Sequence, residues 1–161
     1  MDLRVATLAD ILRLNTKLFR NCLDSFEDDA AAVRPSSSTN SAAFIAAHLA
    51  DSRFFLLRIL GAEHPNPLAP YLEAARGIDD VKQFPPLAAT LAAWSTAAHA
   101  LRDRLEALTA TELDGPTAAR FPGAEQTMIG ALTFLVQHDS YHIGQLAFLR
   151  KYGGLPAMRY T

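Results

Sequence analysis

Residues 137–151, QHDSYHIGQLAFLRK, place two histidines four positions apart, His138 and His142. In an α-helix, positions i and i+4 lie one above the other on the same face. At about 100° per residue, this pair shares its face with Leu135 and Leu149 and is expected to point into a core. Imidazole nitrogens in an apolar setting need a hydrogen-bond partner or a metal ion. The stretch therefore predicts a helix that carries either a metal-ligating pair or two hydrogen-bonded core histidines.

A third histidine lies on a second apolar helix face. Residues 40–60, NSAAFIAAHLADSRFFLLRIL, read as a helix with Thr39 or Asn40 as its N-cap. His48 shares a face with Phe44 and Phe55, so it is also expected to point inward. Zinc-type sites require three or four protein ligands. We therefore predict one divalent-metal site formed by His48 and the pair on the later helix.

The other two histidines are expected in solvent. His64 precedes Pro65 in a proline-rich loop, where an extended backbone is favoured. His99 lies about 140° from Trp94 on its helix, away from the apolar stripe. Neither one is predicted to join the metal site.

Four long amphipathic segments predict an all-α four-helix bundle, with residues 1–161 as a single domain. Their approximate bounds are 7–24, 40–61, 85–108 and 127–153. Thr7 and Asp10 resemble a capping box for the first segment, and its inward stripe includes Ile11 and Cys22. Pro85 and Pro86 suit the first turn of the third, whereas Thr127 begins the fourth, and Gly61 can end the second. The loop at 61–84 is expected to hold a short helix at 71–76.

Composition limits the class of protein. The chain is 50% hydrophobic and 20% charged, with a net charge of −2, so no basic surface for nucleic acid or an anionic membrane is predicted. Cys22 is the one cysteine, which excludes an intramolecular disulfide and fits a reducing compartment. No signal sequence and no apolar run of about 18 residues is present. A cytoplasmic location is expected.

The segments SAAFIAAHLAD at 41–51 and HDSYHIGQLAFLR at 138–150 resemble the DinB-like family of damage-inducible and YfiT-like metal-dependent proteins. The resemblance implies a four-helix bundle in up-down-down-up order and a homodimer. It also implies a divalent-metal site, nickel or zinc, with His48, His138 and His142 as ligands. Gln145 matches a residue that recurs one turn beyond the last ligand.

Several neighbours of the three histidines are candidates for supporting roles. Gln145 and Tyr141 are predicted to orient a bound small molecule through hydrogen bonds, with Tyr141 at the mouth of a pocket. Asp139 or Asp51 could hydrogen-bond an imidazole. Gly144, costly in the middle of a helix, predicts either a close helix–helix approach or a neutral surface position.

Three functions are compatible with a three-histidine site. Three neutral ligands leave a position open for water or substrate, which favours metal-assisted hydrolysis of a small-molecule substrate. Related proteins use a low-molecular-weight thiol, bacillithiol or mycothiol, in transferase or isomerase chemistry. The alternative is a non-enzymatic metal-binding stress-response dimer. For a homodimer surface, Phe54 and Leu57 are candidates because they lie outside the main apolar stripes.

Other metal-enzyme classes fit less well. HDSYH at 138–142 departs from the zinc-protease motif H-E-x-x-H by an aspartate in place of glutamate. A ferritin-like di-iron site needs inward glutamates and E-x-x-H pairs, which the predicted helices lack. No Gly-rich phosphate loop or paired CxxC motif is present.

Overall fold

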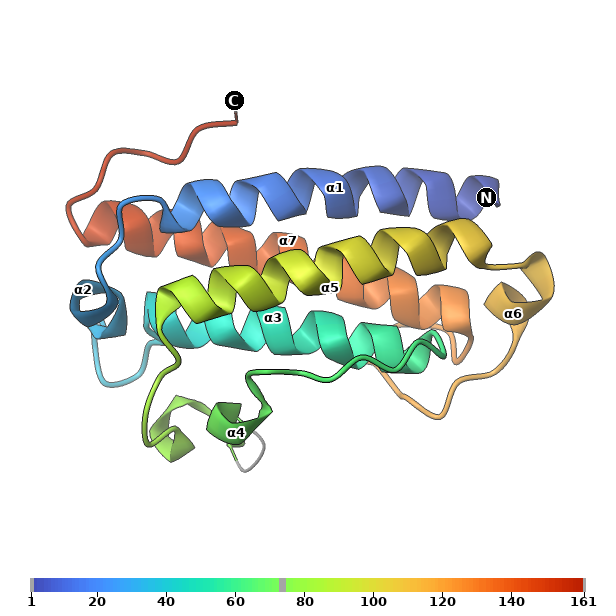
Figure 1. Cartoon of the computed structure of the whole chain (residues 1–161), viewed down its shortest axis with the longest axis horizontal. Coiled ribbons are helices and arrows are strands. Elements are labelled where there is room, and N and C mark those ends of the chain that lie inside the picture. Colours follow the sequence, from blue (N-terminus) through green and yellow to red (C-terminus); the bar gives the residue numbers. More distant parts are fainter. Residues whose placement is uncertain (1, 73–74, 161) are drawn as a thin grey trace.

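The computed structural model describes residues 2–72 and 75–160, and its regular elements in these ranges are all helices. Four of them are long and form the bundle (Figure 1). Their bounds are α1 (Leu3–Leu23), α3 (Ala42–Ile59), α5 (Leu87–Ala107) and α7 (Met128–Tyr152). The short elements are α2 (Asp28–Ala32), α4 (Ala69–Leu72), the 3-10 helix η1 (Ile78–Asp80) and α6 (Ala110–Asp114). The predicted all-α class is confirmed.

The long helices follow the predicted up-down-down-up order. In Figure 1, α1 and α7 run in one direction, whereas α3 and α5 run in the other. Helix α1 packs against α7 and α5, and α3 packs against the same two helices. The seam between α3 and α7 thus joins antiparallel neighbours, and it brings the middle of α3 beside the middle of α7.

Capping side chains mark where three of the four long helices begin, namely α1, α3 and α7. Asp2 caps α1 by accepting a hydrogen bond from the backbone of Arg4, so the predicted capping box at Thr7 is wrong, because the helix starts a turn earlier. Ser41 caps α3, one residue after the predicted position. Thr127 caps α7 as predicted, and Gly61 ends α3 with a φ of 75°.

The core lies where all four helices meet. Trp94 of α5 is fully buried and stacks on Phe19 of α1, with ring centroids 4.0 Å apart. Cys22 is buried, in agreement with its predicted packing role. Ile11 is 36% exposed, so its predicted inward placement is wrong; its neighbour Leu12 takes the core position.

The residues proposed for a homodimer surface are part of the chain's own core. Phe54 is 6% exposed and Leu57 is fully buried. Helix α3 is covered by α5 and α7, and also contacts α2 and α4, so it buries more than one stripe. That prediction for these two residues is therefore wrong.

The connections and the surface complete the molecule. The predicted helix at 71–76 corresponds in part to α4, and its positions 73–74 lie outside the described residues.

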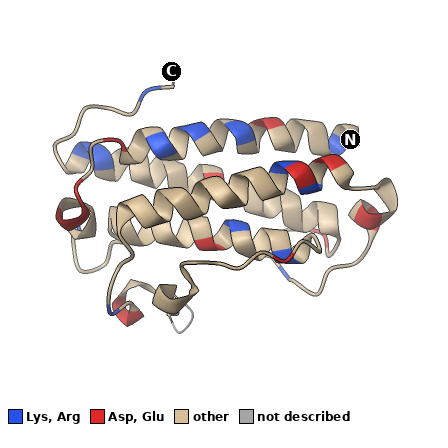
Figure 2. Cartoon of the chain, viewed as in Figure 1, with Lys and Arg blue, Asp and Glu red and all other residues tan. Residues whose placement is uncertain are grey.

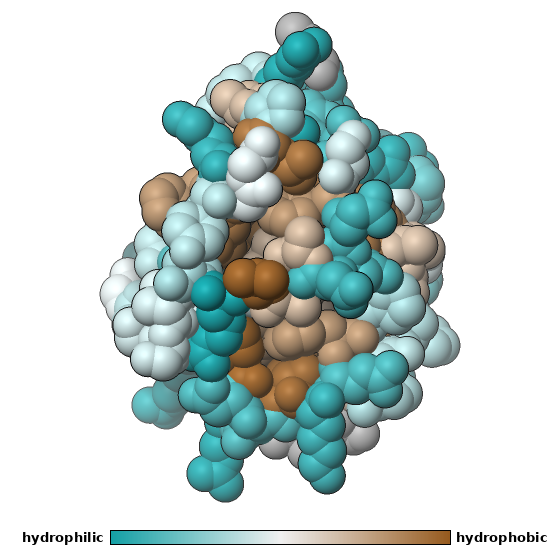
Figure 3. Space-filling view, turned by 90° about the vertical axis from the view of Figure 1, so that its left-hand side faces the viewer, coloured by the Kyte–Doolittle hydropathy of each residue, from teal (hydrophilic) through white to brown (hydrophobic). Residues whose placement is uncertain are grey.

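On the surface, basic residues lie along α1, whereas acidic ones lie on α2 and α6 (Figure 2). At the end of the bundle that carries α2, apolar side chains form a strip between hydrophilic ones (Figure 3). Across the described ranges, none of the helices combines the length and apolarity that a bilayer crossing requires.

Candidate metal centre

The three predicted histidines meet at the seam between α3 and α7. The Nε2 atoms of His48 and His138 are 3.0 Å apart. The ring centroid of His142 lies 5.0 Å from that of His48 and 4.4 Å from that of His138. One ring nitrogen from each residue lies within 4.8 Å of the other two. The structure thus assembles a three-histidine group that could hold a metal ion.

The group is half-buried rather than enclosed in the core. The buried face of α7 contains Asp139, Ile143 and Leu146, and Asp139 lies about 100° around the helix from His138. The histidines are therefore not directed into the core as predicted, but lie to one side of the buried face of α7. They stand at the border between the core and solvent, where a ligand can reach them.

A short hydrogen-bond chain holds the third imidazole. The Nδ1 atom of His142 is 2.6 Å from Oε1 of Gln145, and Gln145 Nε2 donates to the Tyr141 hydroxyl over 3.2 Å. Because Oε1 is an acceptor, the proton of His142 resides on Nδ1. Its Nε2 atom then carries the lone pair that a metal requires. Gln145 and Tyr141 therefore lie beside the histidine group as predicted, and Gln145 hydrogen-bonds to His142.

The cluster does not satisfy its own polar atoms. His138 Nδ1 is buried and has no hydrogen-bond partner, and no other side-chain nitrogen or oxygen in the described ranges shares that state. Buried polar groups are nearly always paired, so such an atom requires an explanation. This atom is not the Nε2 atom that faces His48, so neither a hydrogen-bonded trio nor an ion held by the Nε2 atoms would pair it.

The donor set fits a divalent transition metal. Zinc–nitrogen bonds of about 2.0–2.1 Å in a tetrahedral site separate two ligand nitrogens by about 3.3 Å. The 3.0 Å contact between His48 and His138 is close to this value. Imidazole suits zinc and nickel alike. The third nitrogen needs a small approach of His142 to complete the set.

Burial keeps the three imidazoles neutral. Desolvation, aided by the neighbouring His142, lowers the pKa of His48 to about 4. Desolvation, together with His142 and His48, lowers the pKa of His138 to about 4. Burial also lowers the pKa of His142, although its hydrogen bond to Gln145 opposes this. Neutral imidazole is the form that ligates a metal, so the site is ready for one at pH 7.

Aromatic rings border the cluster on two sides. Phe44 lies parallel to His48, with centroids 6.0 Å apart, and Phe134 lies beside His138 at 6.5 Å. Phe121 stacks on Phe134 at 4.6 Å. These rings lower the local polarity, which strengthens the interaction of a metal with its ligands.

An open groove adjoins the cluster on the Gln145 side, with a cavity volume of about 480 Å³. Its lining comes from the loop before α3, from α3 and from α7. The lining residues are Pro35, Ser38, Thr39, Asn40, Ile45, Tyr141, Gly144, Gln145, Phe148 and Leu149. None of the three histidines lines this groove, which is connected to the cluster through Gln145 and its hydrogen bond to His142.

The two aspartates predicted to support an imidazole do not do so. Asp139 is paired with the buried Arg53, with 2.9 Å between Arg53 Nε and the carboxylate. Asp51 accepts a hydrogen bond from Asn66. Sequence reasoning missed Arg53, which directly precedes the apolar run 54–57 and gives no clear sign of burial in the sequence. His64 and His99 are exposed, as predicted.

Gly144 does not mediate a close helix contact. An added Cβ atom at this position would meet nothing within 4 Å. The glycine instead lines the groove beside Gln145. Of the two predicted alternatives, the close helix–helix approach is therefore wrong and the surface position is confirmed, because Gly144 is exposed and faces open space.

The fold agrees with comparisons to known proteins. The profile of the DinB superfamily matches residues 11–146, and the chain belongs to that superfamily. A conserved protein from Enterococcus faecalis is structurally similar, with a TM-score of 0.73 at 14% identity, over 94% of this chain and 96% of that one. A DinB-like protein from Bacillus subtilis gives a TM-score of 0.62 at 16% identity, over 99% of both chains. At these identities the likeness shows the fold. No curated protein matches the chain.

Proposed function

We propose that the protein binds one divalent ion, nickel or zinc, through His48, His138 and His142. We propose further that it is a metal-dependent enzyme that activates water or a low-molecular-weight thiol toward an electrophilic small molecule. Such an enzyme is a hydrolase or a thiol S-transferase. The observation that carries the proposal is the assembly of three neutral imidazoles from two helices, with ligand nitrogens within 4.8 Å of one another.

The ion would supply Lewis acidity, which lowers the pKa of a water or thiol nucleophile and polarises an electrophile. The side chains around the cluster would orient the metal ligands and shield them from water. Gln145 keeps the His142 proton on Nδ1 and so directs Nε2 toward the centre of the cluster. Tyr141 accepts from Gln145 and restrains that amide. Phe44 and Phe134 limit the access of bulk water to the histidine rings.

The groove beside Gln145 supports an enzyme over a protein that only stores or senses metal. An enzyme needs a concave surface that holds a substrate next to its reactive group. The cavity of about 480 Å³ shares Gln145 and Tyr141 with the hydrogen-bond chain that reaches His142. A small molecule in this groove would lie next to the metal-ligating residues.

Metal analysis of protein purified without a nickel column tests the first half of the proposal. We expect one nickel or zinc ion per chain by mass spectrometry and titration calorimetry. His138→Ala should abolish stoichiometric binding, because two ligands do not complete a site. His64→Ala and His99→Ala are matched controls that should keep the metal, since both residues are exposed and outside the cluster. Full metal content in His138→Ala would overturn the assignment.

The second half requires a reaction. Metal-loaded and chelator-stripped protein should be compared on a panel of esters, amides and thiol-plus-electrophile pairs. We expect turnover of at least one class in the loaded protein and loss of that turnover on stripping. Identical rates for both forms on every substrate would leave a metal-binding protein without the proposed activity.

A further inference from the structure

Helix α7 carries a glycine for which packing gives no reason. Gly144 lies in the helix interior, where glycine is less favourable than alanine. An added Cβ would meet nothing within 4 Å, and the backbone has no positive φ at this position. Position 144 is exposed and faces the groove beside Gln145.

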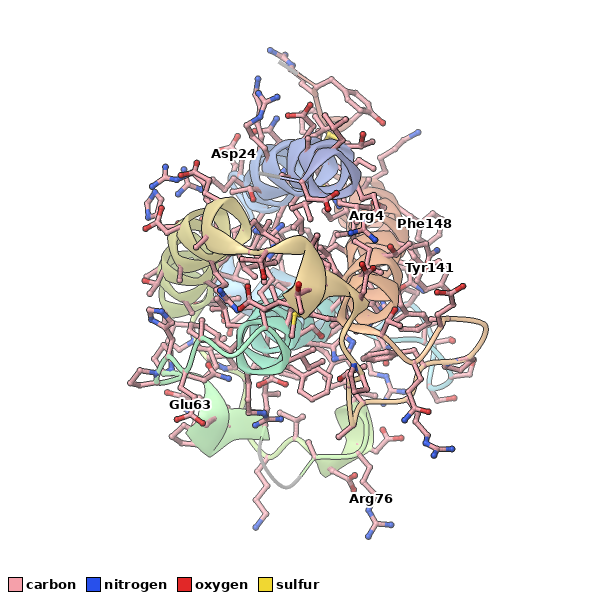
Figure 4. All side chains as sticks on the ribbon, turned by 90° about the vertical axis from the view of Figure 1, so that its right-hand side faces the viewer. Arg4, Asp24, Glu63, Arg76, Tyr141 and Phe148 are labelled. Carbon is pink, nitrogen blue, oxygen red and sulfur yellow. The ribbon has the colours of Figure 1, made fainter. Side chains whose placement is uncertain are left out.

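Two exposed aromatic residues stand on either side of this glycine. Tyr141 is 57% exposed and Phe148 is 64% exposed. They are seven residues apart, which places them on one face and about 10.5 Å apart along the helix axis. Both extend from α7 away from the bundle (Figure 4). We call the space between the two rings, above Gly144, the α7 notch.

The notch offers a ligand two aromatic side chains. The backbone rises about 10.5 Å from Tyr141 to Phe148, and both residues line the groove together with Gly144. Aromatic pairs in proteins favour centroid separations of about 4.5–7 Å, so a flat ring in the groove could contact either side chain. A large side chain at position 144 would reduce this space.

The walls of the notch select for an uncharged ligand. None of the ten lining residues carries a charge, although 20% of the chain is charged. Ile45 and Leu149 add apolar surface, and the loop at 38–40 offers two hydroxyl groups and an amide for hydrogen bonds. A charged group placed here would lose hydration without gaining an ionic partner.

We infer that the α7 notch binds the planar, uncharged aromatic part of the small molecule on which the proposed metal site acts, with a hydroxyl or carbonyl group facing residues 38–40. The role as substrate rests on the proposed function, whereas the binding itself does not. Gln145 connects the two places, since it lines the groove and bonds to His142. The notch thus accounts for the two exposed aromatic residues with one ligand class.

The probe for the test is 2-naphthylmethanol, titrated by ligand-observed NMR against zinc-loaded and EDTA-treated protein. We expect saturable binding in both forms. Its charged analogue 2-naphthoate should bind at least 5-fold more weakly. Gly144→Trp should weaken binding of 2-naphthylmethanol at least 10-fold by filling the notch, whereas Gly144→Ala should change it less than 3-fold.

A second pair of variants keeps the test independent of any folding defect in Gly144→Trp. Phe148→Ala should weaken binding about 3- to 10-fold by removing one stacking partner. Tyr152→Ala is the matched control, because Tyr152 is an exposed aromatic residue of the same helix that does not line the groove. Equal losses in these two variants would overturn the proposal, and so would unchanged binding in Gly144→Trp.

The two proposals can fail separately. Probe binding without any metal binding would refute the metal site and leave the notch intact. Metal binding by His48 and its partners without probe binding would refute the notch alone. Light scattering provides a further check: if Phe148→Ala halves the particle mass and the wild-type protein ignores the probe, the notch is a contact between copies and the inference is wrong.

Discussion

His138 and Asp139 are neighbours in the sequence, yet they serve two different polar centres of the bundle. Asp139 faces the middle of the core and pairs with Arg53, and both side chains are nearly inaccessible, at 3% and 2% exposed. Arg53 also donates to Thr16 Oγ1 over 2.7 Å and to the Leu12 carbonyl over 3.3 Å. Its guanidinium carbon lies 3.3 Å from the centroid of the Trp94 ring. This ionic centre ties α1, α3, α5 and α7 together.

The histidine centre is the opposite case. It is half-buried, its rings face one another, and Nδ1 of His138 has no partner. A polar group fully paired in the core specifies the fold. The three histidines are instead half-buried and could hold a metal ion, so the ionic centre serves the structure and ligand binding is proposed for the histidine centre.

The largest effect should come from breaking the ionic centre. Asp139→Ala leaves the Arg53 charge buried without its carboxylate, which should cost about 3–5 kcal/mol of unfolding free energy. Urea denaturation of the metal-free protein measures this change. His138→Ala should destabilise that protein much less, because the imidazole gives up one weak contact at a solvent border.

Removing both charges gives the control for this prediction. The double variant Arg53→Met/Asp139→Leu should recover most of the loss, since a buried ion pair contributes little net stability compared with apolar residues of similar size. If Asp139→Ala were no more destabilising than His138→Ala, the contrast between the two centres would be wrong.

A smaller effect is expected from Gln145, which hydrogen-bonds to His142 and is not itself a proposed metal ligand. Gln145→Ala removes the acceptor that keeps the His142 proton on Nδ1, and should weaken metal affinity about 10- to 100-fold without abolishing binding. Competition against a chelator of known affinity measures it. Gln145→Glu keeps an acceptor oxygen at the same position and should retain the affinity. An unchanged affinity in Gln145→Ala would show that His142 is oriented by packing alone.

The pH dependence of stability separates the centres in another way. The folded-state pKa values of His48 and His138 are about 4, below the value of about 6.5 expected in the unfolded chain. Between these values the unfolded state binds more protons, so stability must fall as the pH drops from 6.5 toward 4. One pKa unit is worth about 1.4 kcal/mol, and solvent screening at this seam reduces the total loss to about 1–2 kcal/mol.

Urea denaturation of EDTA-treated protein at pH 7 and pH 4.5 tests this sign. The variant His48→Gln/His138→Gln should lose less stability over the same interval, because its substituted positions no longer take up protons. A loss of stability in the wild-type protein that is no larger than the loss in this variant would contradict neutral histidines in the folded state.

The same contrast explains what the sequence could and could not predict. The helices, their order and the histidine group follow from periodicities within single segments and from the family resemblance. The face of α7 that packs into the core does not follow from them. Asp139 lies at the centre of that face, and its partner Arg53 lies 86 positions earlier in the sequence. A charge at a core position resembles a surface residue until its partner is known. Phe54 was misplaced for a related reason, since the number of neighbours around α3 cannot be read from one helix.

The smallest effects on stability are expected at two glycines of α7. One of them lies in a packed part of the helix and the other in an open part. An added Cβ at Gly130 would lie 2.2 Å from the Glu125 carbonyl oxygen, whereas one at Gly144 would meet nothing. Gly144→Ala should therefore stabilise the protein by about 1 kcal/mol, through the better helix propensity of alanine. Gly130→Ala should destabilise it, because the loop before α7 must move. Thermal unfolding of both variants measures the pair. A loss of stability in Gly144→Ala would mean that position 144 is covered in solution, and the groove beside the histidines would then not be open.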